Sequence, residues 1–179
     1  MRYAISGPIG SGKSTVSSEL SKLTGYRVYS GGEFFRETAK RIGMSIEEFN
    51  IYAEKHPEMD YETDNTEKEF LEKNDNIIVE SRLSGWICKN NSINAIKVYL
   101  YATYYTRVFR FSNRENMPIS EASYLLESRE NSEKKRYMDL YGFDMDDKSI
   151  YDIVINTEFL NPKEIAGIIY EHGRVYSTG

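Results

Sequence analysis

The chain has 179 residues and carries 28 acidic against 23 basic residues, for a net charge of −5. This acidic balance argues against sequence-independent DNA or RNA binding, which needs a basic surface, and no apolar run approaches the ~18 residues of a membrane-spanning helix. One domain fits this length and the 40% hydrophobic content, and the lone cysteine, Cys88, cannot form an internal disulfide, so we expect a reducing, cytoplasmic compartment.

The first predicted elements are a strand over residues 2–6, a glycine-rich loop and a helix. The loop, GPIGSGKST at residues 7–15, matches the pattern G-x-x-x-x-G-K-[ST] between Gly7 and Ser14. Its glycines let backbone N–H groups approach an anion, and the following helix turns its positive end towards the same point. We therefore predict a nucleoside triphosphate site, in which Lys13 reaches the β- and γ-phosphates and the Ser14 hydroxyl binds Mg²⁺.

Further strands are predicted from runs rich in apolar and β-branched residues, with helical patterns between them. Strands and helices that alternate in this way are typical of an α/β fold with a parallel sheet. The four later runs, which bring the predicted strands to five, are YRVYS at 26–30, NIIVES at 76–81, AIKVYLYA at 95–102 and YDIVINT at 151–157.

Residues 31–74 contain no strand-like run and predict two or three helices. Ser45 and Glu48 form a capping box in this stretch, since each side chain can accept from the other residue's backbone N–H at the start of a helix. Asn161 and Pro162 likewise predict the start of the last helix. A crossover between parallel strands needs only about a dozen residues, so we expect the connection between the second and third strands to carry a helical insert.

Arginines at helical spacing mark the stretch after the fourth predicted strand. Arg107, Arg110 and Arg114 are spaced i, i+3, i+7 and share one face of a predicted helix. We expect the other side of this helix to pack on the sheet through Tyr104, Tyr105, Val108, Phe109 and Phe111.

A second stripe lies on the next predicted helix, where Arg129, Glu133 and Arg136 are spaced i, i+4, i+7. The link between the two helices, ENMPI at 115–119, is short enough to fold them into a hairpin. Such a hairpin brings guanidinium groups from both helices towards a common point.

Two more arginines, Arg36 and Arg82, each follow a predicted strand closely. Ligands of doubly wound sheets collect at the carboxyl ends of the strands. Because a guanidinium group binds phosphate oxygens in a bidentate manner, these arginines and those of the hairpin indicate a second phosphate beside the triphosphate. The alternative is that arginines on helices are solvated and form weak surface ion pairs.

Taken together, several segments resemble the P-loop nucleoside monophosphate kinases, most closely the archaeal-type cytidylate kinases. The resemblance covers nearly the whole chain, and only its first segment is shared by many kinases. It implies one domain with a three-layer α/β fold around a parallel sheet, a helical monophosphate-binding insert at about 31–74 and a short lid at about 110–140. The matching segments are GPIGSGKST (7–15), SGGEFFRETAK (30–40), GMSIEEFNIYAEKHPEMDYETD (43–64), ESRLSGW (80–86), RENSEKKRY (129–137) and SIYDIVINT (149–157).

The resemblance also implies an activity, which is transfer of a phosphoryl group from Mg²⁺-bound ATP to CMP or dCMP by a monomer. The residues that would act in catalysis are Lys13, Arg36, Arg82 and Arg129. Those that would bind the monophosphate are Ser30, Arg36, Asp60, Arg82, Glu133 and Arg136, with Asp64 in the same insert. Those that would bind ATP are Gly7, Pro8, Ile9, Gly10, Ser11, Gly12, Lys13, Ser14, Thr15, Arg110, Arg114, Asn156 and Thr157, with Ser14 also on the metal.

Three positions depart from the family pattern. Ile9 stands in the loop where Pro is common, and Gly31 stands where Ala is common. Ser81 replaces a common Gly just before Arg82, where its side chain would lie beside the base pocket.

The chemistry of a monophosphate acceptor agrees with this composition. The acceptor is already an anion at neutral pH, so its oxygen attacks without losing a proton to a protein base. The reaction then needs arginines, a lysine and Mg²⁺ but no catalytic histidine. We expect His56 and His172, the two histidines of the chain, to be surface residues.

Three alternatives remain open from the sequence. A kinase for a hydroxyl acceptor would need a carboxylate base, for which Glu80 and Asp60 are candidates. AMP or UMP could replace CMP, since only base contacts separate these acceptors. A GTPase-like switch protein would carry an N-K-x-D element, which this sequence lacks.

Overall fold

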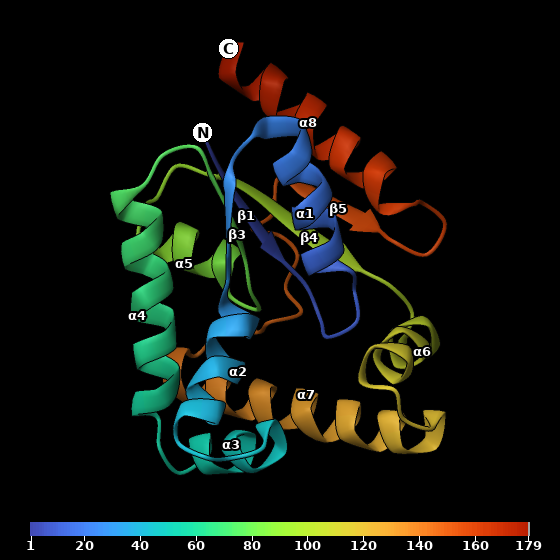
Figure 1. Cartoon of the computed structure of the whole chain (residues 1–179). Helices are drawn as coiled ribbons and strands as arrows, with labels where there is room; N and C mark the ends of the chain where they lie inside the picture. Colours follow the sequence, from blue (N-terminus) through green and yellow to red (C-terminus); the bar gives the residue numbers. More distant parts are fainter. Residues whose placement is uncertain (179) are drawn as a thin grey trace.

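The computed structural model describes residues 1–178, and a five-stranded sheet forms its centre (Figure 1). The strands lie in the order β2–β3–β1–β4–β5, and every neighbouring pair is parallel. The predicted α/β fold and all of the predicted strands are therefore confirmed. The strands are β1 (Arg2–Ser6), β2 (Arg27–Ser30), β3 (Ile77–Glu80), β4 (Ile96–Tyr101) and β5 (Ile153–Asn156).

Helices cover both faces of the sheet and give the molecule three layers. α1 (Lys13–Thr24) and α8 (Pro162–Thr178) pack against each other on one face, and α5 (Ser84–Asn90) covers the other. Successive residues of the central strand β1 serve the two layers, since Ile5 belongs to one apolar core and Ala4 to the other. This explains the nearly continuous apolar runs of the inner strands. No helix within the described residues combines the length and the apolar character needed to cross a membrane.

The connection from β2 to β3 forms the predicted insert. It contains α2 (Gly31–Arg41), α3 (Ile46–Ala53) and α4 (Glu58–Lys73), and α4 returns along the side of the sheet (Figure 1). The predicted capping box is present at α3, where Ser45 Oγ accepts from the Glu48 N–H at 3.2 Å and Glu48 Oε2 accepts from the Ser45 N–H at 2.8 Å. The local sequence therefore sets where this helix begins.

The predicted hairpin consists of α6 (Tyr104–Glu115) and α7 (Ile119–Tyr141), but the expected packing of α6 on the sheet is wrong. The side chains of Tyr105 and Phe109 are 84% and 56% exposed. The chain leaves the sheet beyond β4, so the apolar residues that α6 buries form a single narrow stripe against α7 and the phosphate loop. That stripe joins Val108 and Phe111 to Ile9, Ala122 and Leu126.

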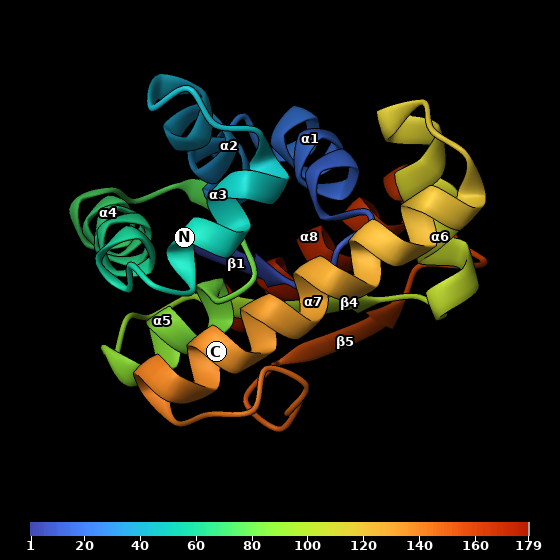
Figure 2. The same ribbon diagram turned by 90° about the horizontal axis from the view of Figure 1, so that it is seen from below.

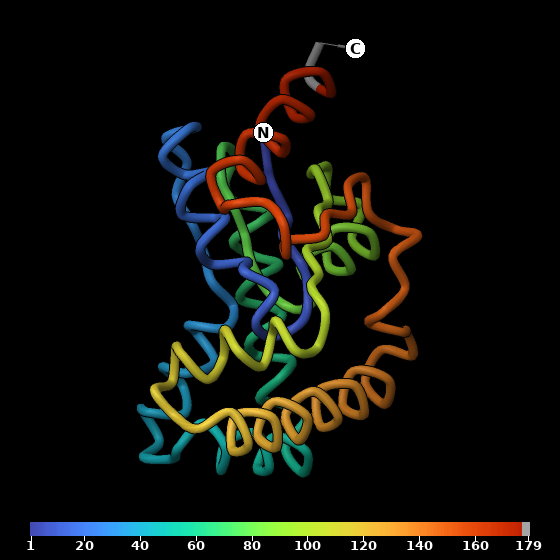
Figure 3. Tube along the Cα trace, turned by 90° about the vertical axis from the view of Figure 1, so that its right-hand side faces the viewer, coloured from blue at the N-terminus to red at the C-terminus, as the bar shows by residue number. Residues whose placement is uncertain are grey.

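The long helix α7 lies across the end of the sheet at which the strands finish. Figure 2 looks onto this end and shows α7 crossing in front of β1 and β4, from α6 towards α5. Figure 3 shows α7 at the same end of the molecule as the insert, and α7 contacts α3 there. Side chains from α7 and the insert thus meet above the carboxyl ends of the strands, where ligands of such sheets bind.

Candidate functional site

A cavity of about 530 Å³ lies at the carboxyl end of the sheet. Its walls come from the phosphate loop, the start of α2, the end of β3, the α6–α7 hairpin and the residues after β5. The sequence predicts phosphate-binding residues in each of these parts, and the fold brings most of them together. The predicted residues that line the cavity are Ile9, Gly10, Gly12, Lys13, Ser14, Thr15, Ser30, Arg36, Arg82, Arg110, Arg114, Arg129, Glu133 and Thr157.

The phosphate loop folds tightly because its glycines adopt backbone angles that disfavour other residues. Gly10 has φ +77°, and a Cβ at this position would lie 2.7 Å from the carbonyl oxygen of Arg107. Gly12 has φ +92° and ends the loop, and α1 begins at the next residue. The first N–H groups of α1 have no partner within the helix, so the helix presents donors and a positive dipole end to the cavity.

Lys13 bends back over the loop in this structure. Its Nζ donates to the carbonyl oxygens of Gly7 and Pro8, at 2.8 and 3.0 Å. Burial lowers the pKa of Lys13 to about 8, although the Glu80 carboxylate acts in the opposite direction. An anion bound in the loop would favour the charged form, because an opposite charge at close range raises the pKa of an ammonium group.

Glu80 joins the loop to the insert at the end of β3. Its Oε1 accepts from Ser14 Oγ at 2.8 Å and from Ser30 Oγ at 2.5 Å. Hydroxyl and carboxylate oxygens are ligands that suit Mg²⁺, directly or through water. Among the described residues, no group of three or more acidic, histidine or cysteine side chains could hold a metal alone. A metal between Ser14 and Glu80 would therefore take its remaining ligands from phosphate oxygens and water.

Arg82 bridges the phosphate loop and α7. Its Nη1 donates to the carbonyl oxygen of Gly7 at 3.0 Å, and its Nε lies 2.6 Å from Glu133 Oε2, too poorly aligned for a hydrogen bond. Burial alone would raise the pKa of Glu133, but the charges of Arg82, Arg129 and Arg136 outweigh it and hold that pKa below its ordinary value. Glu133 is thus a carboxylate surrounded by the guanidinium groups that the sequence predicts for a phosphate.

Three predicted arginines of the cavity, Arg36, Arg110 and Arg129, have no ion pair among residues 1–178, and Arg110 is hydrogen-bonded to Thr157. The Nε of Arg129 is buried and lacks a hydrogen-bond partner, and its guanidinium lies 5.9 Å from the ring centre of Phe111. Arg36 is exposed at the rim of the cavity. Arg114, by contrast, pairs with Glu115 at 2.7 Å on the surface. Arg36 and Arg129 can therefore bind an anion without first leaving a carboxylate.

Thr157 ties the lid to the phosphate loop. Its Oγ1 donates to the Ser11 carbonyl at 3.0 Å and accepts from Arg110 Nη1 at 2.8 Å, and Arg110 Nη2 donates to the Thr157 carbonyl at 2.7 Å. Asn156, the preceding residue, bonds to Glu158 and does not line the cavity. Next to Thr157 the wall is apolar and suits the flat face of a base, and it is formed by Leu160, Pro162 and Ile165.

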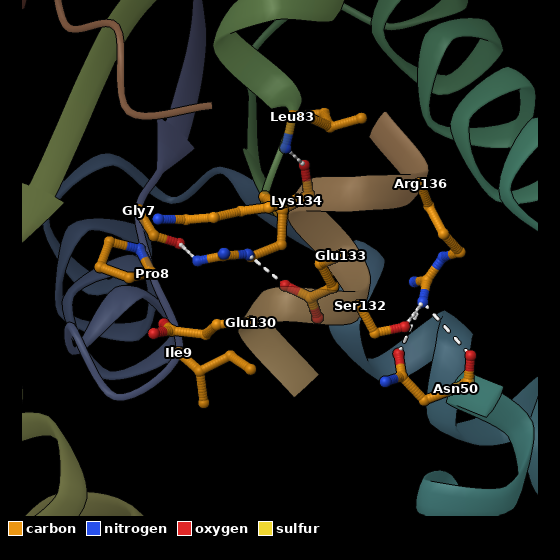
Figure 4. Close-up of polar contacts among 12 residues, drawn as sticks. Gly7, Pro8, Ile9, Asn50, Leu83, Glu130, Ser132, Glu133, Lys134 and Arg136 are labelled. Atoms are coloured by element: carbon orange, nitrogen blue, oxygen red, sulfur yellow. Dashed lines mark hydrogen bonds and ion pairs between the residues drawn. The ribbon is translucent and has the colours of Figure 1, made fainter. Parts of the chain in front are cut away.

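Asp60 and Arg136 lie away from the large cavity and are bonded to each other. Arg136 Nε donates to Asp60 Oδ2 at 2.7 Å. Figure 4 shows two further contacts of Arg136, whose Nη1 donates to Asn50 Oδ1 at 2.9 Å and to Ser132 Oγ at 2.7 Å. The side chains of Arg136 and Asp60 are only 5% and 1% exposed. This pair therefore connects α4, α3 and α7.

A smaller cavity of about 60 Å³ adjoins the large one between α2, α4 and α7. Arg136 lines this smaller cavity, whereas Asp60 lines neither cavity. The residues shared by the two cavities are Gly32, Ser81, Arg82, Arg129 and Glu133.

Several contributors to the site are not predicted from the sequence as ligand-binding residues. Glu80 is considered there only as the base of an alternative reaction, although a carboxylate that ends a buried strand is a recognisable signal. Arg107 is the opposite case, because the sequence places it on the same helix face as Arg110 but it does not line the cavity. Its Nη1 donates to the Ile9 carbonyl and pairs with Glu130. Ordinary apolar residues such as Leu160 carry no signal of this kind.

Neither histidine lines the two cavities described above. His56 is stacked on Tyr52 with ring centres 3.8 Å apart, and its Nδ1 lies 2.8 Å from Glu58 Oε1. His172 is exposed on α8. Cys88 of α5 is buried in the apolar core between this helix and the sheet. Burial raises the pKa of its thiol to about 12, so it behaves as a small apolar residue.

Comparison with known proteins identifies the family. A sequence model described as the cytidylate kinase-like family matches residues 3–159, which is most of the chain. The chain belongs to the cytidylate kinase-like family. It is 67% identical to a cytidylate kinase of Thermoplasma volcanium over 169 residues, which cover 94% of this chain and 89% of that protein. It is 39% identical to a cytidylate kinase of Archaeoglobus fulgidus, with 94% of this chain and 92% of that protein covered.

Solved structures extend the likeness of this cytidylate kinase-like chain to other kinases at the level of the fold. The shikimate kinase of Aquifex aeolicus superposes with a TM-score of 0.60 at 20% identity, covering 99% of this chain and 98% of the other. A protein of Eubacterium ventriosum superposes with a TM-score of 0.71 at 18% identity, covering 96% and 97%. These structures share the sheet and its helices with the cytidylate kinase-like chain, and at such identities they carry no information on its acceptor.

Proposed function

We propose that the chain transfers the γ-phosphoryl group of ATP to CMP or dCMP, with ADP and CDP or dCDP as products. The observation that carries this proposal is the single cavity lined by the phosphate loop on one side and by Arg36, Arg82 and Arg129 on the other. These arginines come from the insert, the sheet and the lid. The cytidylate kinase relatives, at up to 67% identity over nearly the whole chain, support CMP as the acceptor.

The acceptor side of the cavity accounts for the chemistry of attack. Arg36 and Arg82 hold the monophosphate of CMP through bidentate hydrogen bonds, which aim one phosphate oxygen at the γ-phosphorus of ATP. Because that oxygen is already charged, no side chain has to remove a proton. The protein contributes alignment of the two nucleotides and positive charge between them, and these terms dominate phosphoryl transfer.

The donor side holds the triphosphate. The N–H groups of the loop and of the first turn of α1 donate to its oxygens. Lys13 Nζ leaves its hydrogen bonds with the Gly7 and Pro8 carbonyls and donates to the β- and γ-phosphates instead. Arg129 reaches the phosphoryl group in transit from the lid. The apolar wall at Leu160 receives the adenine ring.

Magnesium fits this site through the Ser14 hydroxyl and the Glu80 carboxylate. Both residues line the large cavity, and their oxygens lie 2.8 Å apart. When bound, the ion neutralises charge on the β- and γ-phosphates. The protein's part is to place one hydroxyl and one carboxylate beside the loop and to leave the other coordination positions to phosphate and water.

Closure of the insert (about 31–74) and of the lid (about 110–140) completes the proposal, because water in the site would otherwise accept the phosphoryl group. A bisubstrate analogue that joins ATP to CMP should slow amide exchange in both segments relative to the free protein. Equal exchange with and without the analogue would contradict closure. The monomeric state and the cytoplasmic location stay predictions from the sequence.

The decisive experiment is an acceptor panel with Mg²⁺ and ATP. CMP, dCMP, UMP, AMP and shikimate are compared by product formation at equal concentration. The proposal expects CMP and dCMP to have the highest kcat/KM, with shikimate inactive because it brings no phosphate to Arg36 and Arg82. A preference for AMP, or for an acceptor with only hydroxyl groups, would overturn it.

A further inference from the structure

Glu67 is a buried carboxyl group that the mechanism above does not use. It lies on α4, its residue is 1% exposed, and it lines the smaller cavity together with Gly31, Ser81 and Asp64. Its Oε2 lies 2.9 Å from the point that a Cβ on Gly31 would occupy, so only a bare glycine backbone stands on that side. Among residues 1–178, no hydrogen-bond partner of this oxygen is seen.

A chain of hydrogen bonds fixes which oxygen of Glu67 can donate. The backbone N–H of Leu83 donates to Ser81 Oγ at 3.0 Å, and Ser81 Oγ in turn donates to Glu67 Oε1 at 2.8 Å. In this chain Ser81 Oγ accepts from Leu83 and donates to Glu67, so Oε1 is an acceptor. A proton on the carboxyl group leaves this chain intact when it sits on Oε2, the oxygen beside Gly31, a residue that also lines the smaller cavity.

The surroundings favour a proton on Glu67. Burial raises the pKa of this carboxyl well above its ordinary value, and the negative charge of Asp64 raises it further. The hydrogen bond from Ser81 acts in the opposite direction, and Glu80 adds a smaller increase. Asp64 lies three residues earlier on the same face of α4, and its Oδ2 accepts from Tyr141 at 2.6 Å. The cavity thus combines one oriented O–H donor with a neighbouring acceptor.

We propose that Glu67 determines the preference for cytosine over uracil, by donating from Oε2 to N3 of the base while Asp64 or Oε1 accepts from the 4-amino group. The proposal rests on the proposed CMP kinase function and names the group that reads the base. Cytosine presents an acceptor at N3 beside an amino donor. Uracil presents an N–H donor at N3 beside a carbonyl acceptor. Its N3–H would face the Oε2–H donor of Glu67, and its carbonyl oxygen would face the accepting oxygen of Asp64 or Glu67. A buried site of this type rejects the mismatched ligand because its own polar groups lose their partners.

The first test compares Glu67→Leu with Glu67→Gln. Leucine removes the donor, and we expect the ratio of kcat/KM for CMP to that for UMP to fall about 10- to 100-fold, mainly through KM for CMP. In glutamine, Oε1 still accepts from Ser81, so the amide N–H₂ takes the place of the Oε2–H donor and should restore most of the ratio. The matched control is Glu72→Leu, an exposed carboxyl on the same helix outside both cavities, which should leave the ratio unchanged.

The second test probes the same contact from the ligand. A CMP analogue with C–H in place of N3 should lose about 10- to 100-fold in kcat/KM with the wild-type protein, but no more than two- to three-fold with Glu67→Leu. Two results would overturn the inference. One is a folded Glu67→Leu protein whose ratio of kcat/KM for CMP to that for UMP stays within two-fold of wild type. The other is an equal loss of kcat/KM with the analogue in the wild-type and Glu67→Leu proteins. Failure of the proposed function is distinguishable, since the wild-type protein would then not prefer CMP at all.

Discussion

The two sides of the cavity are built from different amounts of chain. The donor side takes most of its groups from nine consecutive residues, 7–15, which run into the first turn of α1. The acceptor side takes Arg36 from α2, Arg82 from the end of β3 and Arg129 from α7. The donor side therefore depends on backbone conformation, and the acceptor side depends on the packing of remote elements.

The two sides also neutralise their positive charges differently. On the donor side Lys13 is bonded to backbone carbonyls, which release it without leaving a charge behind. On the acceptor side Arg82 faces Glu133 and Arg136 faces Asp60. A phosphate bound at Arg82 would therefore compete with a carboxylate of α7 for this guanidinium group. We therefore expect phosphate binding at the acceptor site to be coupled to the position of α7. The phosphate loop of the donor side has no such coupling.

The largest effects are expected from removing one cation on each side. Lys13→Ala and Arg129→Ala should each lower kcat by at least ~10²–10³, because each removes a donor to the charge that develops during transfer. Steady-state rates with saturating ATP and CMP measure this. Arg41→Ala, an exposed arginine of α2 outside both cavities, is the control. Turnover of Arg129→Ala within a few-fold of wild type would show that the lid does not reach the phosphoryl group.

A large loss of stability is expected when the buried pair between insert and lid is broken. Arg136→Ala leaves Asp60 buried without its cation and should reduce the free energy of unfolding by about 3–5 kcal/mol. Urea denaturation without ligand measures this. Lys73→Ala removes an exposed ion pair with Glu69 at the far end of α4 and should leave the midpoint unchanged. Similar midpoints for the two variants would mean that the insert and the lid are not held together by this pair.

A moderate effect is expected where the insert meets the sheet beside the smaller cavity. A Cβ on Gly31 would lie 2.8 Å from the Cβ of Ser81, so Gly31→Ala should cost about 1–3 kcal/mol of stability. Adding Ser81→Gly removes this contact, although not the one with Glu67 Oε2 at 2.9 Å, and should recover part of the loss. Unfolding curves of the two single variants and the double variant give the coupling. Strictly additive effects would show that the two positions do not share this space.

The smallest effect is a change in how stability depends on pH. Burial raises the pKa of Asp64 to about 7, with Asp60 adding to the shift. The folded protein binds this proton more tightly than the unfolded chain, in which the pKa is about 3.9, so stability falls as pH rises from about 4 to about 7. Asp64→Asn removes this titration and should unfold at higher urea than wild type at pH 8, with the difference closing towards pH 4.

The matched control for that pH dependence is Asp147→Asn. Hydrogen bonds from Ser149 hold the pKa of Asp147 below its ordinary value, so its contribution has the opposite sign and is present at neutral pH. Asp147→Asn should therefore be no more stable than wild type at pH 8. Parallel pH profiles for wild type and Asp64→Asn would contradict the assignment to Asp64.

The sequence predicts the fold in detail wherever a local signal suffices. The apolar runs locate all of the strands, Ser45 with Glu48 marks the start of α3, and the strand-free stretch 31–74 indicates the helical insert. The packing of α6 is predicted wrongly because the periodicity of a helix shows which residues are apolar but not which partner covers them. Its actual partner, α7, is met only after the chain has left the sheet.

The site divides along the same line. The sequence by itself determines the phosphate loop, because Gly10, Gly12 and Lys13 act through backbone angles and distances within one turn of chain. The tertiary structure alone decides that Glu133 faces Arg82, that Arg136 is bonded to Asp60, and that Ser81 orients Glu67. Long-range contacts of this kind depend on how separate elements pack, and the spacing of residues along the chain does not contain that information.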